Sequence, residues 1–336
     1  MSDALVSPPV ALAAGAVSLV LLGTAVRKLR RGQRVPGSAG SGTVDDVPAG
    51  PDEHLVPLMG VMGAFVFAAQ MINFAIPGTG SSGHLVGGIL LAAMLGPWAA
   101  LLTLTSVLVI QCLLFADGGF MALGCNILNM AVLSTLVAYP LIFRPLMRPG
   151  ATPGRIAAAS LLASVAALEL GAVAVTLETE ASGITALPLG RFLGFMLPIH
   201  LFIGIGEGLA TAAVINVVRR YKPELLVAVR QQTKPVRRRP GRALAVIAAA
   251  ALLLGASFTW LASSDPDGLE WSVGKTAGTA ELEAGPDGAH RMAAALQERT
   301  ALMPDYNTTL AGVIGSGAIL AVVFGAACLF RAGQKP

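Results

Sequence analysis

The side chains that could do chemistry in this 336-residue chain are the few ionisable ones within its apolar segments. His84 follows a turn rich in glycine and serine, and His200 and Glu207 lie in a later apolar segment. Imidazole binds Ni²⁺, Co²⁺, Cu²⁺ and Zn²⁺ well, and ionisable groups inside a bilayer mark functional sites. A single histidine more often has a structural role, so the residues alone leave metal binding by His84 and a structural His84 both open.

Two pairs of polar residues share helix faces. His200 and Glu207 are separated by about two turns of helix, which places them on one face. This pair either lines a cavity or ties two helices together by hydrogen bonds. Asn126 and Asn129, which share a face in the same way, either brace a site or join helices. Glu169 lies in a further apolar segment.

The composition and the motifs exclude several classes of protein. Charged residues make up 12% of the chain, against about 25% in soluble domains, so a soluble enzyme is not expected. The sequence contains no GxxxxGK[ST] loop, HExxH motif or Ser/His/Asp arrangement, so any ATP hydrolysis is expected in a separate chain. The three cysteines form no CxxC pair and give neither a disulfide framework nor a thiolate metal site. We expect no enzyme and no permanently bound cofactor.

Nine apolar segments organise the chain. A helix needs about 20 mostly apolar residues to cross about 30 Å of hydrocarbon. The segments are residues 9–26, 55–76, 85–95, 98–116, 120–143, 156–177, 192–218, 243–262 and 310–330. We therefore expect an all-α, polytopic membrane protein of about nine transmembrane segments, of which segment 85–95 is short.

The basic residues indicate how these segments are oriented. Of the 23 lysines and arginines, 19 follow the first segment, separate the fifth from the sixth, follow the seventh or close the chain. Positive charge concentrates in cytoplasmic loops. Nine crossings place all 19 on the cytosolic side of a prokaryotic cytoplasmic membrane, with the N-terminus outside, provided that segment 85–95 crosses. This segregation accounts for the net charge of +4, and we expect no nucleic-acid partner.

A basic linker divides the chain into two units. We expect a seven-segment unit at 1–220, a cytosolic linker at 221–240, and a two-helix unit at 241–336 with an outer loop at 263–309. That loop carries eight acidic and three basic residues. It is either a solvated loop that obeys the charge rule or an acidic surface that gathers cations.

Several long strings of residues resemble one family. They are VPLMGVMGAFVFAAQMINF at 56–74, IPG at 76–78, SGHLVGG at 82–88, LGPWAA at 95–100, LLFADGG at 113–119, LGCNILNM at 123–130 and HLFIGIGEG at 200–208. These strings resemble the CbiM/NikM family, the substrate-binding (S) components of energy-coupling factor (ECF) transporters for cobalt and nickel. DPDGLEW at 265–271 resembles the PDGLE domain, which often follows such a protein as a fused NikN/CbiN-like subunit with two membrane helices around an outer loop.

The resemblance implies a function. Such a component captures Ni²⁺ or Co²⁺ outside the membrane and delivers it for nickel enzymes or cobalamin synthesis. The energy comes from separate ATPase subunits through a transmembrane coupling (T) subunit. His84 is then a metal ligand, and Met1 and the residues after it lie near the ion. Asn126, Asn129, His200 and Glu207 become candidates for holding the ligands in place.

The start of the chain departs from the family's pattern. Family members begin with Met-His, and their terminal amine, a backbone amide and that histidine bind the ion together with a second histidine in the glycine-rich loop. A planar set of nitrogens suits Ni²⁺. Met1 of this chain aligns with the family's third residue. Either a Met-His pair precedes Met1 in the native protein or half of the site is lost, and we expect the former.

Two other functions stay open. The chain could be an ion-coupled secondary metal transporter with Glu169 and Glu207 as proton sites, which would need no ATPase partner. It could also be a membrane scaffold or sensor that binds no ion and tolerates the loss of His84.

Overall fold

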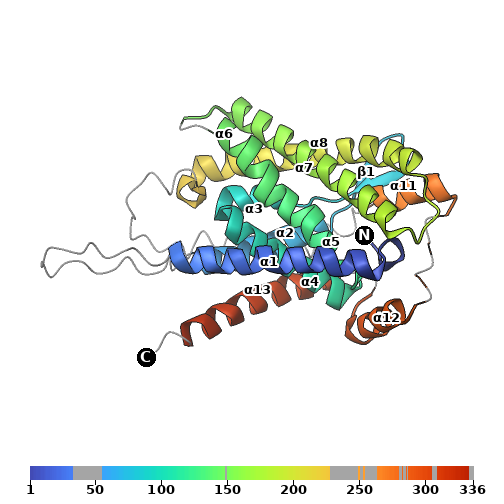
Figure 1. Ribbon diagram of the computed structural model, residues 1–336. Coiled ribbons are helices and arrows are strands. Elements are labelled where there is room, and N and C mark those ends of the chain that lie inside the picture. The colour runs from blue at the N-terminus through green and yellow to red at the C-terminus, as the bar shows by residue number, and fades with distance from the viewer. Residues whose placement is uncertain are drawn as a thin grey trace, which may run out of the picture.

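The computed structural model describes residues 1–32, 55–147, 150–227, 263–279, 287–304 and 309–332, together with Ala249, Leu253, Leu282 and Gly285 (Figure 1). The expected helix at 243–262 and most of the expected linker at 221–240 lie outside these residues.

The chain is a polytopic helical membrane protein, as the sequence predicts. Its longer helices are α1 (Pro8–Gly32), α2 (Leu55–Gln70), α4 (Pro97–Phe115), α7 (Pro153–Ser182), α8 (Leu189–Tyr221) and α13 (Thr309–Ala332), with α5 (Leu123–Asn126) continuing into the π-helix η2 (Ile127–Phe143). The shorter elements are η1 (Asp3–Leu5), α3 (Gly88–Leu95), α6 (Arg144–Leu146) and η3 (Pro223–Leu225). Within the described residues, five helical stretches are long and apolar enough to cross a membrane: 8–30, 97–115, 123–146, 153–182 and 189–221.

The long helices run between two ends of one bundle (Figure 1). One end holds the N-terminus, β1 and α11, and we call it the N-terminal end. At the opposite end, the Lys28 ammonium lies 5.3 Å from the ring centroid of Trp98, so the end of α1 meets the start of α4. The chain therefore turns from α3 into α4 at the end of the bundle opposite the N-terminus.

The third apolar segment is not a full-length helix. A helix of eight residues such as α3 is about 12 Å long, whereas the hydrocarbon core is about 30 Å thick. An antiparallel hairpin of β1 (Phe74–Ile76) and β2 (Ser81–Gly83) and the irregular residues 84–87 precede α3. The segment thus joins the two ends of the bundle by irregular backbone followed by a short helix.

Helices α7 and α8 pack closely along their length. A β-carbon added at Gly204 would lie 2.8 Å from the Val165 Cα, and one added at Gly208 would lie 2.6 Å from the Leu161 Cα. Small residues four apart allow two membrane helices to approach in this way. The contact fixes the rotation of α8, which carries both His200 and Glu207.

The described part of the expected outer loop at 263–309 contains two helices, which the sequence analysis did not predict. It contains α11 (Gly268–Ala277) and α12 (Gly288–Thr300). Two of its acids cap these helices, since Asp267 accepts the N–H of Glu270 at 2.8 Å and Asp287 accepts the N–H of His290 at 2.9 Å. Burial of the Glu270 carboxyl, assisted by the charge of Asp267, raises its pKa. Part of the acidity of this segment therefore serves helix capping.

The contact between α1 and α5 gives a test of the packing at the N-terminal end. A β-carbon at Gly124 would lie 2.6 Å from the Gly15 backbone nitrogen, whereas one at Gly15 meets nothing within 4 Å. We expect Gly124→Ala to lower the free energy of unfolding by about 1–3 kcal/mol, because backbone must move to admit the methyl group. Gly15→Ala is the matched control and should be neutral or stabilise by up to about 1 kcal/mol. Thermal or denaturant unfolding of both purified variants checks this, and equal stability would contradict the packing.

Candidate metal site

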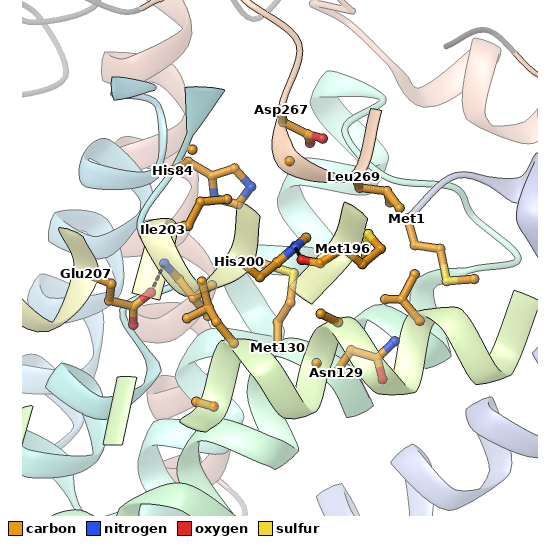
Figure 2. Close-up of a pocket in the computed structure, with 18 of the residues that line it drawn as sticks. Met1, His84, Asn129, Met130, Met196, His200, Ile203, Glu207, Asp267 and Leu269 are labelled. Carbon is orange, nitrogen blue, oxygen red and sulfur yellow. Dashed lines mark hydrogen bonds between the residues drawn. The ribbon is translucent and has the colours of Figure 1, made fainter. Parts of the chain in front are cut away.

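One cavity of about 120 Å³ at the N-terminal end brings together all six residues that the sequence suggested for a metal site. Those six are Met1, His84, Asn126, Asn129, His200 and Glu207. Figure 2 shows His84 and Met1 entering from different elements, with His200 and Met196 on α8. Their grouping is a structural finding, and their roles toward a metal stay predictions.

The N-terminal segment forms one wall of the cavity. The carbonyl oxygen of Met1 accepts hydrogen bonds from the Gly119 N–H at 3.0 Å and the Asn126 side-chain amide at 3.2 Å. The Asp3 carboxylate accepts the N–H of Ala122 at 2.9 Å, at the start of α5. The N-terminal segment is therefore tied to the loop and helix that follow α4, in part through Asn126.

His84 follows the hairpin directly, and its ring turns into the cavity (Figure 2). The hairpin is held from outside the bundle by the segment that starts α11. Ser82 donates its N–H to the Pro266 carbonyl at 2.8 Å, and the Trp271 indole donates to the Thr79 carbonyl at 3.0 Å. Residues 266–271 therefore cover the segment that presents His84.

Glu207 fixes the irregular backbone between the hairpin and α3. Its buried carboxylate accepts the N–H of Val86 at 2.8 Å and that of Gly87 at 3.2 Å. The carbonyl of Val86 accepts the amide of Gln70 at 2.8 Å, and Gln111 donates to Gln70 at 2.7 Å. The backbone N–H and C=O of Val86 are thus both hydrogen-bonded, which holds the nearby His84 in place.

A hydrogen bond within α8 determines which ring nitrogen of His200 carries the proton. Nδ1 of His200 lies 2.8 Å from the Met196 carbonyl, which can only accept, so Nδ1 carries the proton. In the neutral ring Nε2 then has a free lone pair. His200 and Glu207 both line the cavity. The hydrogen bonds of Glu207 go to the irregular residues 86 and 87 and that of His200 stays within α8, so these bonds do not join two helices.

Asn129 connects the cavity wall to α7. Its side-chain amide donates to the Glu178 carboxylate at 2.7 Å. Sequence reasoning missed Glu178 because the expected span 156–177 ended just before it, whereas α7 continues to Ser182. Gln70 and Gln111 were detectable as single amides within apolar runs.

The cavity also contains side chains that the sequence did not single out. Met130, Met196 and Asp267 line it, and Asp267 comes from the PDGLE-like string. Within the described residues, no three His, Cys, Asp or Glu side chains are grouped to hold a metal ion. Glu169, the other carboxylate considered as a proton site, is partly buried on α7 and is not among the residues that line this cavity.

Two family models match the chain. The model described as the cobalt uptake substrate-specific transmembrane region, CbiM, matches residues 1–225, and the PDGLE domain matches residues 241–332. The chain belongs to the CbiM family. The resemblance of the chain to this family, with a fused PDGLE domain, is confirmed.

Two named relatives and a solved structure support the match. A protein of Archaeoglobus fulgidus, provisionally named a fused nickel transport protein NikMN, is 33% identical over 282 residues, covering 81% of this chain and 86% of the relative. The fused nickel transport protein NikMN of Rhodobacter capsulatus is 34% identical over 200 residues, covering 55% of this chain and 56% of the relative. A crystal structure described as a truncated transition metal transporter has a TM-score of 0.53 and 28% identity, covering 66% of this chain and 98% of that chain.

Removal of the Glu207 carboxylate should free the segment that carries His84. We expect Glu207→Ala to increase amide hydrogen exchange at residues 84–88 strongly, because two buried N–H groups lose their acceptor. Each unsatisfied N–H destabilises the segment by about 1–3 kcal/mol. Asn216→Ala is the control on the same helix, since it removes only the bond to the Ala212 carbonyl, 2.9 Å within α8. Exchange at 84–88 that is the same in both variants would contradict the role of Glu207.

Proposed function

We propose that this CbiM-family chain is the substrate-binding membrane component of a transporter that imports Ni²⁺ or Co²⁺. Its residues 1–220 capture the ion, residues 221–240 form a cytosolic linker, and residues 241–336 form a PDGLE unit. The ion is the substrate of the protein. The names of the fused nickel transport relatives support this class of substrate.

The observation that carries the proposal is the single cavity shared by the N-terminus and His84. Backbone nitrogen and imidazole are donors that suit Ni²⁺ and Co²⁺, and planar nitrogen coordination suits Ni²⁺. We place Met1 and His84 at the ion. Asn126 positions the carbonyl of Met1, and Glu207 positions the segment that carries His84, because partners of metal ligands fix the orientation of those ligands. Asn129 and His200 line the rest of the cavity around the ion.

The proposed orientation places this cavity on the outer side of the cytoplasmic membrane. The segregation of basic residues supports an N-terminus outside the cell. The opposite end of the bundle, where Arg219 and Arg220 close α8, then faces the cytosol. A transmembrane coupling subunit and ATPase subunits would dock at this basic end and supply the energy.

Loss of the His84 imidazole should abolish metal binding without unfolding the protein. We expect His84→Ala to weaken Ni²⁺ binding by more than about 100-fold, since even the partners of metal ligands contribute about 10- to 100-fold. Glu169→Gln is the control, because it changes a membrane carboxylate that does not line the cavity. Calorimetric titration of the purified variants with Ni²⁺ measures both.

Wild-type affinity in a folded His84→Ala protein would contradict the proposed site. Loss of Ni²⁺ binding in Glu169→Gln with normal binding in His84→Ala would instead support the secondary-transporter alternative.

Metal accumulation should depend on ATPase partners. We expect cells that express this chain to stop accumulating radioactive nickel when the genes for the partner ATPase subunits are deleted, because this chain has no phosphate-binding loop. Re-expression of the ATPase subunits should restore uptake. Accumulation that continues without them and collapses when the proton gradient is dissipated would show that the energy source is different.

A further inference from the structure

One face of α12 lies against the segments that form the metal cavity. His290 and Ala293 are buried on this helix, whereas Met292 is 74% exposed. One helical turn beyond Ala293, Gln297 donates to the Gly118 carbonyl at 2.7 Å, in the loop that also holds Met1. In Figure 1, α12 lies beside the N-terminal end of the bundle. This helix belongs to the region matched by the PDGLE model.

Among the described residues, the ring nitrogens of His290 have only hydrogen-bond acceptors as partners. Its Nδ1 lies 2.8 Å from the Asp287 carboxylate, and its Nε2 lies 3.1 Å from the carbonyl of Asp3 and 3.1 Å from that of Val6. The side chain is 2% exposed, so water does not substitute for these partners. Carboxylate and carbonyl oxygens cannot donate, so all three contacts are hydrogen bonds only when both ring nitrogens carry protons.

The charges around the ring favour that doubly protonated form. Burial lowers the pKa of His290, but the hydrogen bond to the Asp287 carboxylate and its charge outweigh burial, and the net shift is upward. The N–H of His290, in turn, lowers the pKa of Asp287. An imidazolium at this position donates Nε2–H to the two carbonyls of the N-terminal segment and Nδ1–H to Asp287, and both hydrogen bonds are charge-assisted.

The two carbonyls that His290 binds flank the turn that directs Met1 into the cavity. Asp3 begins η1, and Val6 is the residue that ends it. The other ties on this segment come from residues 119, 122 and 126, all within the CbiM region. Leu5 and Val6 also pack in one hydrophobic cluster with Phe192 and Met196 of the CbiM region. Among the described residues, the hydrogen bonds from the CbiM region to this segment lie only at Met1 and the Asp3 carboxylate, so His290 adds hydrogen bonds from the PDGLE region at Asp3 and Val6.

We propose that His290 is a positioning residue through which the PDGLE region fixes the N-terminal segment of the metal site. Its Nε2–H fixes the carbonyls of Asp3 and Val6, and Asp287 fixes the ring. The proposal rests on the proposed function for its effect on metal affinity, but its effect on the order of the N-terminal segment needs no metal.

Two variants of similar shape separate the two nitrogens of the ring. In His290→Gln the amide nitrogen takes the place of Nε2 and can donate to the carbonyls, whereas in His290→Asn the amide takes the place of Nδ1 and cannot reach them. We expect His290→Gln to keep low hydrogen exchange at residues 3–7 in the absence of metal. His290→Asn and His290→Ala should increase that exchange, while Met292→Ala, on the exposed face of α12, should leave it unchanged.

Calorimetric titration with Ni²⁺ alone gives the second measurement on the same four variants and the wild-type protein. We expect His290→Asn and His290→Ala to lower the affinity about 10- to 100-fold, as for other residues that hold a metal ligand in place, and His290→Gln to remain near wild type. Wild-type protein that binds no Ni²⁺ would refute the proposed function, yet the exchange data would still test His290. Equal exchange at residues 3–7 in His290→Gln and His290→Asn, or wild-type exchange in His290→Ala, would overturn the inference.

Discussion

The structure depends on the hydrogen bonds that the Glu207 carboxylate makes to irregular backbone inside a helical membrane protein. Backbone outside helices at membrane depth persists only where protein groups satisfy its N–H and C=O groups. Glu207 accepts two N–H groups of residues 86 and 87, and Gln70 donates to the carbonyl of Val86. Because these bonds replace those of a helix, the chain can present His84 from a short irregular segment.

The same requirement explains why distant parts of the sequence meet at the cavity. The hairpin before His84 is covered by residues 266–271, and the N-terminal segment is held by the loop after α4 and by α12. Each segment has too few internal hydrogen bonds to stand alone, so each depends on the others. A site assembled in this way brings the N-terminal segment and a histidine just before the third apolar segment together without a dedicated domain.

Much of this arrangement could be predicted from the sequence. Hydropathy predicts a helical membrane protein, and polar residues within apolar segments point to His84, His200, Glu207 and the two asparagines, which line one cavity. Sequence spacing showed that His200 and Glu207 share a face, but not that Glu207 binds the backbone of residues 86 and 87. That contact depends on how α8 packs against a segment more than a hundred residues earlier.

The structure differs most from the sequence-based expectation in residues 263–309, whose polar and acidic composition is typical of a loop. The spacing of Asp267 and Glu270 is that of a capping box, a signal from which the start of α11 could have been predicted, and Asp287 and His290 give a similar but weaker signal. His290 could not be singled out, since one histidine in a polar segment has no pattern. Its role becomes visible only when both ring nitrogens are seen to face acceptors.

The central claim is that the ion binds between the N-terminus and His84. The most direct test is a crystal structure of the full chain grown with Ni²⁺, with diffraction data collected at the nickel absorption edge. The account predicts an anomalous peak inside the cavity, within bonding distance of a nitrogen of the N-terminal segment and of the His84 imidazole. A nickel peak at Glu169, or on the acidic surface of residues 263–309 with none in the cavity, would contradict it.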